Sequence, residues 1–347
     1  MSRRQHTGQA MNRKGFAIAL LLIAFACDGV RADPVADFYR GKTVTMIIGY
    51  GAGGGYDLYG RLAAEFLGRH IPGGPTIVPQ NMPGAGSFKA AQYLYSAAPK
   101  DGTYLGSVAQ TIALDTAMAG DPALDATKLP YIGRLTSNVD TGVASLQSGI
   151  HSFDDVRKKS YAVGTSGGAS TAVLYPAALN GFAGAKFKLV KGYQGVADVV
   201  LALERGEVEV GGAVGLPLLL ARHPDWLKGG ATIIYQAALT RDRLIPDVPT
   251  LPELGLTDEG KTVLRAISGA AEIGRSILTT PGVPPERLAA LRKAFQEMVT
   301  DPEFLAACDK RNVMLAPATG EEMDAVVAQT MRIPKEVVLK IPPLLKQ

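Results

Sequence analysis

The stretch that decides the fold is residues 44–58, which read VTMIIGYGAGGGYDL. Its apolar, β-branched start (44–48) predicts a strand, and the apolar side chains that recur every fourth residue over 58–66 predict a helix over 57–70. The glycines of 51–55 let the backbone take positive φ values and approach a ligand closely. Because the first amides of a helix lack internal partners, this strand, loop and helix predict a main-chain site for a small anion.

Three kinds of site can be compared with this loop. A phosphate-binding P-loop would end in Gly-Lys-Ser/Thr, but Tyr56-Asp57 stand there, which excludes it. A dinucleotide fingerprint fits at Gly51 and Gly53 and fails at its third glycine, where Tyr56 stands. A carboxylate-binding loop needs only amides and fits. The alternative without a ligand is a tight turn in which Asp57 caps the helix, and we expect Asp57 to be the N-cap in either case.

The first 32 residues have the pattern of an export signal. Four basic residues precede an apolar segment at 16–27 that is too short to span a bilayer, and 30–32 form a small-x-small cleavage site. We therefore expect a signal peptide over 1–32, cleavage after Ala32 and a periplasmic protein. Acylation at Cys27 is the alternative, although the residues before it make a poor lipidation box.

Removal of residues 1–32 changes the charge and the cysteine count. It takes away five basic residues and one acidic residue, which leaves 31 of each from the totals of 36 and 32. A neutral chain carries no basic surface for a nucleic acid partner.

Cys308 is then the sole cysteine, so no internal disulfide forms, and we expect it to be buried on an amphipathic helix. Scattered histidines with no metal-ligand spacing predict neither a metal nor a cofactor.

Short strands alternate with helices in two separate units. In the first, strands at 76–79 and 104–109 flank the loop 81–87 and a helix to about residue 97. In the second, strands at 161–163, 188–190, 208–210 and 232–235 accompany loops at 164–171 and 192–195 and helices to Leu179 and from Val196 to Arg205. This rhythm predicts α/β units with parallel, doubly wound sheets, whose ligands bind outside the carboxyl ends of the strands.

The C-terminal part is predicted to be helical. Helices are expected to begin at Pro284, at Asp301 and at Thr319, where Thr319 and Glu322 can form a capping box.

A second interpretation of the loop at 164–168 is catalytic. Its Gly-x-Ser-x-Gly pattern places Ser166 between a strand and a helix, as in the nucleophile elbow of esterases. The candidate bases are His70, His151 and His223, and only His223 follows Ser166, within the same small unit. An esterase usually places its acid and base farther along the chain, so a binding loop is favoured.

Taken in order, the loops resemble one family. The chain resembles the periplasmic solute-binding proteins of tripartite tricarboxylate transporters, also called Bug receptors, over nearly all of its length after the signal. The motifs that carry the resemblance are GYGAGGGYD (49–57), NMPGAG (81–86), DGTY (101–104), GTSGGAS (164–170), LIPDVPT (244–250) and ELG (253–255).

The resemblance implies a two-lobed periplasmic-binding-protein fold of the Venus-flytrap kind, similar to type II. It implies a first lobe over 33–134 and 273–347, a second lobe over 135–272, and a hinge near Tyr131–Arg134 and near 272–277. It also implies a monomeric, non-enzymatic receptor that holds a small organic carboxylate between its lobes and delivers it to the membrane permease. A sensor that reports to a signalling partner remains an alternative, and so does the esterase.

The expected ligand-binding residues come from both lobes. The first lobe would supply Tyr50, Gly53, Gly54, Gly55, Tyr56, Asp57, Gly84, Ala85, Gly86, Ser87, Gln110 and Thr111. The second would supply Ser166, Gly168, Ser170, Thr171, Tyr193 and Gln194. The sequence departs from the family pattern where Gly49 and Tyr50 replace Pro-Phe and where Gln194 replaces a lysine, so the identity of the acid stays open.

Overall fold

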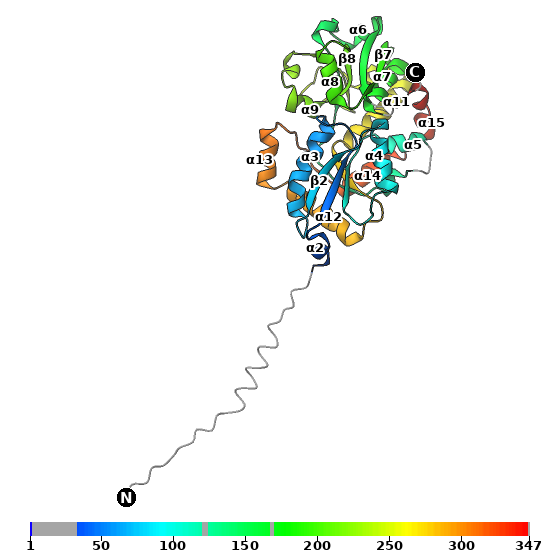
Figure 1. The fold of residues 1–347 in the computed structure, drawn as a ribbon. Coiled ribbons are helices and arrows are strands. Elements are labelled where there is room, and N and C mark those ends of the chain that lie inside the picture. Colours follow the sequence, from blue (N-terminus) through cyan, green and yellow to red (C-terminus); the bar gives the residue numbers. More distant parts are fainter. Residues whose placement is uncertain (2–32, 120–123, 167–169, 346–347) are drawn as a thin grey trace.

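The structure is a computed structural model that describes Met1 and residues 33–119, 124–166 and 170–345. The predicted signal peptide and the candidate Gly168 lie outside the described residues. Two lobes lie one above the other, and each has a β-sheet at its centre (Figure 1). This is the predicted two-lobed α/β architecture.

In the described chain, six strands form the sheet of the first lobe in the order β11-β4-β10-β3-β1-β2. Their bounds are Thr43–Ile48 (β1), Thr76–Asn81 (β2), Tyr104–Ser107 (β3), Tyr131–Arg134 (β4), Ser276–Thr279 (β10) and Ala318–Thr319 (β11). β1 pairs in parallel with β2 and β3, as predicted. The prediction of an all-parallel sheet was wrong for β10, which is antiparallel to β3 and β4, because the chain leaves this lobe after β4 and returns into it along β10.

The described strands of the second lobe follow the order β7-β6-β8-β5-β9. Their bounds are Asp140–Ala144 (β5), Tyr161–Ser166 (β6), Phe187–Tyr193 (β7), Val210–Gly215 (β8) and Thr232–Ala237 (β9). β6 is parallel to β7 and β8, whereas β5 enters from the first lobe and is antiparallel to β8 and β9. The strand predicted at 208–210 begins at Val210 and continues five residues farther.

Helices cover the sheet of the first lobe. They are α2 (Pro34–Tyr39), α3 (Gly55–Leu67), α4 (Phe88–Ser96), α5 (Ile112–Ala119), α12 (Pro285–Met298), α13 (Pro302–Lys310) and α14 (Gly320–Thr330). The predicted capping box of α14 is present, since Thr319 and Glu322 each accept a hydrogen bond from the other's backbone N–H. Cys308 of α13 is 1% exposed within the apolar core, which confirms the expected buried position.

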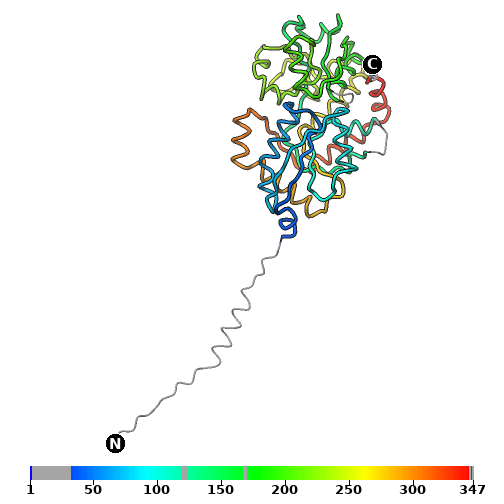
Figure 2. The backbone as a smooth tube through the Cα atoms, viewed as in Figure 1, coloured from blue at the N-terminus to red at the C-terminus, as the bar shows by residue number. Residues whose placement is uncertain are grey.

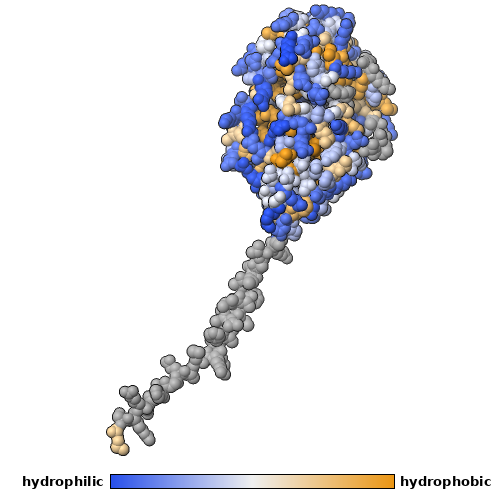
Figure 3. All heavy atoms as spheres, viewed as in Figure 1, coloured by the Kyte–Doolittle hydropathy of each residue, from blue (hydrophilic) through white to orange (hydrophobic). Residues whose placement is uncertain are grey.

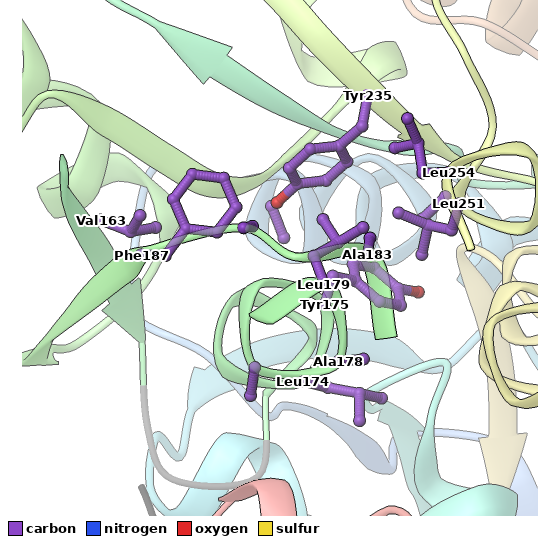
Figure 4. Packing of buried hydrophobic residues seen from close by; sticks show 14 of the residues in the cluster. Val163, Leu174, Tyr175, Ala178, Leu179, Ala183, Phe187, Tyr235, Leu251 and Leu254 are labelled. Carbon is purple, nitrogen blue, oxygen red and sulfur yellow. The ribbon is translucent and has the colours of Figure 1, made fainter. Parts of the chain in front are cut away.

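The second lobe has its own apolar core. Its helices are α6 (Phe153–Lys158), α7 (Thr171–Ala183), α8 (Val196–Glu204), α9 (Leu216–Arg222), α10 (Leu251–Leu254) and α11 (Asp258–Ser268). Figure 4 shows Tyr175 and Leu179 of α7 close to Tyr235 of β9. The Tyr235 hydroxyl donates a hydrogen bond to the Gly212 carbonyl, which satisfies the one polar atom of that ring in an apolar setting.

Two crossing segments run side by side between the lobes. Leu135 N donates to Arg275 O at 2.9 Å, and Arg275 N donates to Thr136 O at 2.8 Å. Asn138 N donates to Ala271 O at 3.0 Å. The crossings therefore form a short hydrogen-bonded ladder between 135–138 and 271–275, which begins directly after the expected 131–134 on one side and overlaps the expected 272–277 on the other.

The C-terminal helices return to the second lobe. Helix α15 (Lys335–Val338) contacts α11 and helix α16 (Pro342–Leu345) contacts α7, and the C-terminal end of the tube lies at the upper lobe (Figure 2). Ile341 belongs to the same apolar cluster as Tyr175. The end of the range 273–347, expected in the first lobe, therefore contacts the second.

Hydrophilic residues predominate on the face shown in Figure 3, with hydrophobic residues scattered among them. Within the described ranges, no helix has the length and apolar character needed to cross a bilayer.

Candidate functional site

The first glycine loop lies directly against a loop of the second lobe. A Cβ added at Gly51 would lie 3.4 Å from Cβ of Gln194, and one at Gly53 would lie 3.5 Å from Cβ of Ala197. A Cβ added at Gly54 would lie 3.0 Å from Cγ1 of Val196. The absence of side chains at these glycines thus lets the two loops meet across the mouth of the cleft.

Helix α3 begins earlier than predicted, and this moves Asp57. The N-cap is Gly54, which has no side-chain hydrogen bond, and Asp57 is the third helical residue, so the N-cap prediction was wrong. The Asp57 carboxylate instead accepts hydrogen bonds from Gly53 N at 2.9 Å, Arg61 Nε at 2.7 Å and Asn81 Nδ2 at 2.8 Å. These hydrogen bonds hold the glycine loop to α3 and β2. The Asp57 side chain lines a separate outer groove of about 530 Å³.

An inner cavity lies between the lobes and is small, at about 30 Å³. Both lobes and a crossing segment contribute to its wall. The lining residues are Tyr50, Gly54, Gly55, Tyr56, Asp140, Ser166, Thr171, Ala172, Val196, Ala213, Gly215 and Arg275. Six of the expected ligand-binding residues are therefore brought together here. The first lobe supplies Tyr50, Gly54, Gly55 and Tyr56, and the second lobe supplies Ser166 and Thr171.

A second cavity of about 170 Å³ shares Tyr50 and Ser166 with the first. Its other lining residues are Gly84, Gly86, Ser87, Gly192, Tyr193 and Gln194. The loop 84–87 is tightly wound, since Ala85 (φ 46°) and Ser87 (φ 81°) join two glycines in the left-handed half of φ space. Such strain is retained where surrounding contacts hold it: the Ser87 hydroxyl accepts a hydrogen bond from Ala109 N at 3.1 Å.

Two tyrosines of the first lobe stack on each other in the inner cavity. The rings of Tyr50 and Tyr56 lie 4.6 Å apart at an angle of 19°. The Tyr50 hydroxyl donates to Gly86 O at 3.3 Å, and the Tyr56 hydroxyl accepts from Gln110 N at 2.8 Å. Burial raises the pKa of Tyr56 to about 12, so this hydroxyl stays neutral near pH 7.

Gln110 and Thr111 are buried but line neither cavity. Gln110 Oε1 accepts from Asn138 Nδ2 at 2.9 Å, and Thr111 Oγ1 donates to Asp115 Oδ2 at 2.9 Å. Both expected residues therefore act behind the cavity wall. Ser170 is the N-cap of α7 and is likewise buried outside the lining.

The sequence interpretation missed two charged residues of the inner cavity. Arg275 is 5% exposed, and its guanidinium lies 4.0 Å from the centre of the Tyr56 ring. Its Nη2 donates to Asn138 Oδ1 at 2.7 Å, while Asn138 Nδ2 donates to Asp140 Oδ1 at 2.6 Å. Burial raises the pKa of Asp140, and the charge of Arg275 opposes that rise. The signal in the sequence was an arginine directly after Gly274, in the segment that returns to the first lobe.

The candidate catalytic bases lie elsewhere. His70 Nε2 lies 3.0 Å from Asp301 Oδ2, the ring of His223 lies 4.6 Å from that of Trp226, and His151 is exposed. Histidine is not among the described residues that line the two cavities around Ser166. The geometry around Ser166 is that of a hydroxyl available for hydrogen bonding in a closed, polar cleft.

Comparisons with known proteins agree with this arrangement. A family model described as "Tripartite tricarboxylate transporter family receptor" matches residues 61–342. A "UPF0065 protein in gbd 5'region" of Cupriavidus necator is 25% identical over 341 residues, which covers 95% of this chain and 96% of that protein.

Solved structures resemble the fold. A TctC solute-binding protein from Polaromonas has a TM-score of 0.56 and 25% identity, and the match covers 87% of this chain and 99% of that one. MatC from Rhodopseudomonas palustris, solved with bound malate, has a TM-score of 0.66 at 18% identity, with 86% and 99% covered.

Proposed function

The chain belongs to the tripartite tricarboxylate transporter receptor family, and on that premise we propose that it binds a small organic carboxylate between its lobes and passes it to a membrane permease. Members of this family are solute receptors, and the MatC structure holds a dicarboxylate in the same fold. The permease subunits and a monomeric receptor are part of this proposal.

The observation that carries the proposal is a cavity whose wall comes from both lobes. Tyr50, Gly54 and Tyr56 lie on one side, and Ser166 and Thr171 lie on the other. A ligand that contacts both sides stabilises the closed arrangement, and the closed arrangement presents a surface that a permease can distinguish from the open one.

Neutral donors would supply most of the contacts to the acid. Gly54, Gly55 and the loop 84–87 would supply amides from the first lobe, and Ser166 and Thr171 would supply hydroxyls from the second. The amide of Gly53 donates to Asp57, and Gly53 lines the outer groove instead. Hydrogen bonds to a charged group contribute roughly 1.5–3 kcal/mol each, so a few of them provide micromolar affinity. The expected contributions of Gly168, Ser170, Tyr193 and Gln194 belong to the same proposal.

The proposal includes a periplasmic location after cleavage at Ala32, and a protein that does not turn over its ligand. The esterase alternative is less well supported, because the wall around Ser166 contains hydroxyls and amides in the described residues and the histidines lie elsewhere. The sensor alternative uses the same site. Neighbouring genes for a large and a small membrane subunit would favour transport, and a sensor kinase gene would favour signalling.

A thermal-shift screen of the purified protein tests the binding function. The panel contains acetate, benzoate, succinate, malate, adipate and citrate, each beside its neutral amide. A ligand at one hundred times its dissociation constant stabilises a protein by about 2.7 kcal/mol, which is a clear rise in melting temperature. A rise with at least one acid supports the proposal. A rise with amides alone, or with none of the acids, would contradict it.

A further inference from the structure

The guanidinium of Arg275 is buried at the point where the two lobes and the crossing segments meet. A Cβ added at Gly55, on α3 of the first lobe, would lie 3.0 Å from Arg275 Nη2. A Cβ added at Gly215, at the end of β8 in the second lobe, would lie 2.9 Å from the same atom. With the Tyr56 ring at 4.0 Å, the guanidinium thus contacts residues of both lobes at once.

This buried cation has neutral neighbours as its direct partners. Nη2 donates to the side-chain oxygen of Asn138, and the guanidinium lies over the face of the Tyr56 ring. Nε has no hydrogen-bond partner in the part of the chain that the structure describes, and Arg275 forms no ion pair there. The carboxylate of Asp140 is reached only through Asn138.

Asp140 supplies a negative charge nearby, but Asn138 lies between it and Arg275, and Nε keeps an unused donor, so a bound anion would improve the arrangement. A buried charge costs several kcal/mol unless it is paired and hydrogen-bonded, and an arginine fork matches a planar carboxylate in shape as well as charge. Arg275 lines the inner cavity, so a ligand in that cavity can reach the guanidinium.

We propose that Arg275 recognises the charge of the ligand: one carboxylate of the ligand enters the inner cavity and pairs with the guanidinium, and the rest of the ligand lies in the second cavity, which shares Tyr50 and Ser166 with the first. The inner cavity, at about 30 Å³, is of a size for a head group, whereas the second cavity offers about 170 Å³ and is lined by uncharged side chains. The favoured ligand is therefore a carboxylate with one charged head and a short polar tail. This inference rests on the proposed function.

The position of Arg275 also links binding to closure. Gly55 and Gly215 flank Nη2 from different lobes, so the charge lies in a dry, two-sided site only when the lobes are together. An anion that pairs with it there favours the closed state by its higher affinity for that state.

The test is the replacement Arg275→Met, which keeps the length of the side chain and removes the charge. We expect each acid that stabilises the wild type in the panel above to lose affinity about 100-fold, while any amide that binds is unaffected. Arg275→Lys keeps the charge without the planar fork, and we expect a loss of about 10-fold. Arg222→Met is the matched control, because Arg222 is exposed and lines the outer groove instead; its affinities should equal those of the wild type.

The outcomes separate the two proposals. Equal affinity of wild type and Arg275→Met for the acids would overturn the role of Arg275 and leave the carboxylate receptor intact. Failure of every acid to stabilise the wild type would overturn both. If Arg275→Met does not fold, the Arg275→Lys variant decides: unchanged affinity would overturn the inference, and a selective loss for acids over amides would support it.

Discussion

Gly54 of the first lobe and Val196 of the second lie so close that a Cβ added at Gly54 would sit 3.0 Å from Val196 Cγ1. The backbone of Gly54 is extended (φ −80°, ψ 176°), so a larger residue fits the local conformation. Threonine is about as good an N-cap as glycine, and helix α3 should tolerate it. We predict that Gly54→Thr holds the lobes apart, weakens ligand affinity at least 10-fold and leaves the unfolding free energy within about 1 kcal/mol.

Small-angle scattering with and without ligand checks this prediction, since the variant should keep a larger radius when the wild type contracts. Gly269→Thr is the control, because a Cβ there meets nothing within 4 Å. A Gly54→Thr protein that binds and contracts like the wild type would show that the two loops do not govern closure.

The side chain of Asn138 makes three hydrogen bonds, and the two that reach charged groups lead to a stability prediction. Its amide bridges Arg275 and Asp140, two buried charges that have no direct contact with each other. Asn138→Ala removes one hydrogen bond from each charged group, at roughly 1.5–3 kcal/mol apiece. We predict a loss of about 3–5 kcal/mol in urea unfolding at pH 7. The exposed Gln147→Ala should change stability by less than about 0.5 kcal/mol, and a similar small change for Asn138→Ala would refute the bridging role.

Local patterns in the sequence were sufficient for the elements that depend on near neighbours. The strand, glycine loop and helix around residue 55 and the capping box of Thr319 and Glu322 were predicted, because each is defined by residues within a few positions. Asp57 was misplaced by the same kind of reasoning. Gly54 and Gly55 can adopt either loop or helix conformations, and the contacts of the folded loop decide between them.

Features that depend on distant pairing could not be predicted in this way. The antiparallel direction of β10 and the burial of Arg275 both arise where residues 134–136 meet residues 275–276, about 140 positions apart in the sequence. A local pattern carries no information on that meeting, so Arg275 was not among the expected ligand-binding residues. Its role became visible only through its contacts with Tyr56 and Asn138.

Asp115 predicts a particular dependence of stability on pH. Burial raises its pKa from the ordinary 3.8 to about 7, with a hydrogen bond from Thr111 opposing the rise. Between about pH 4 and 7 the unfolded state releases this proton while the folded state keeps it. The stability therefore falls as pH rises through this window and levels off above it. The difference corresponds to roughly 4 kcal/mol at most.

Asp115→Asn removes this titration. We predict that the variant gains stability relative to the wild type when urea unfolding at pH 8 is compared with unfolding at pH 5, where the wild-type side chain is still protonated in the folded state. A constant difference between the two proteins at both pH values would show that Asp115 ionises normally in the fold.

Ser166 separates the receptor from the esterase. Its hydroxyl lines both cavities, and its backbone belongs to β6 in the second lobe, so Ser166→Ala removes a ligand contact without disturbing the sheet. We predict a loss of affinity of about 10–100-fold, the value of one hydrogen bond to a charged group of roughly 1.5–3 kcal/mol, with unfolding unchanged. Ser160→Ala, an exposed site on the same lobe, should leave affinity unchanged. Hydrolysis of p-nitrophenyl acetate should be equally slow for all three proteins, because no histidine lies beside Ser166 in the described cavity walls. Turnover by the wild type that disappears in Ser166→Ala would instead establish the serine as a nucleophile.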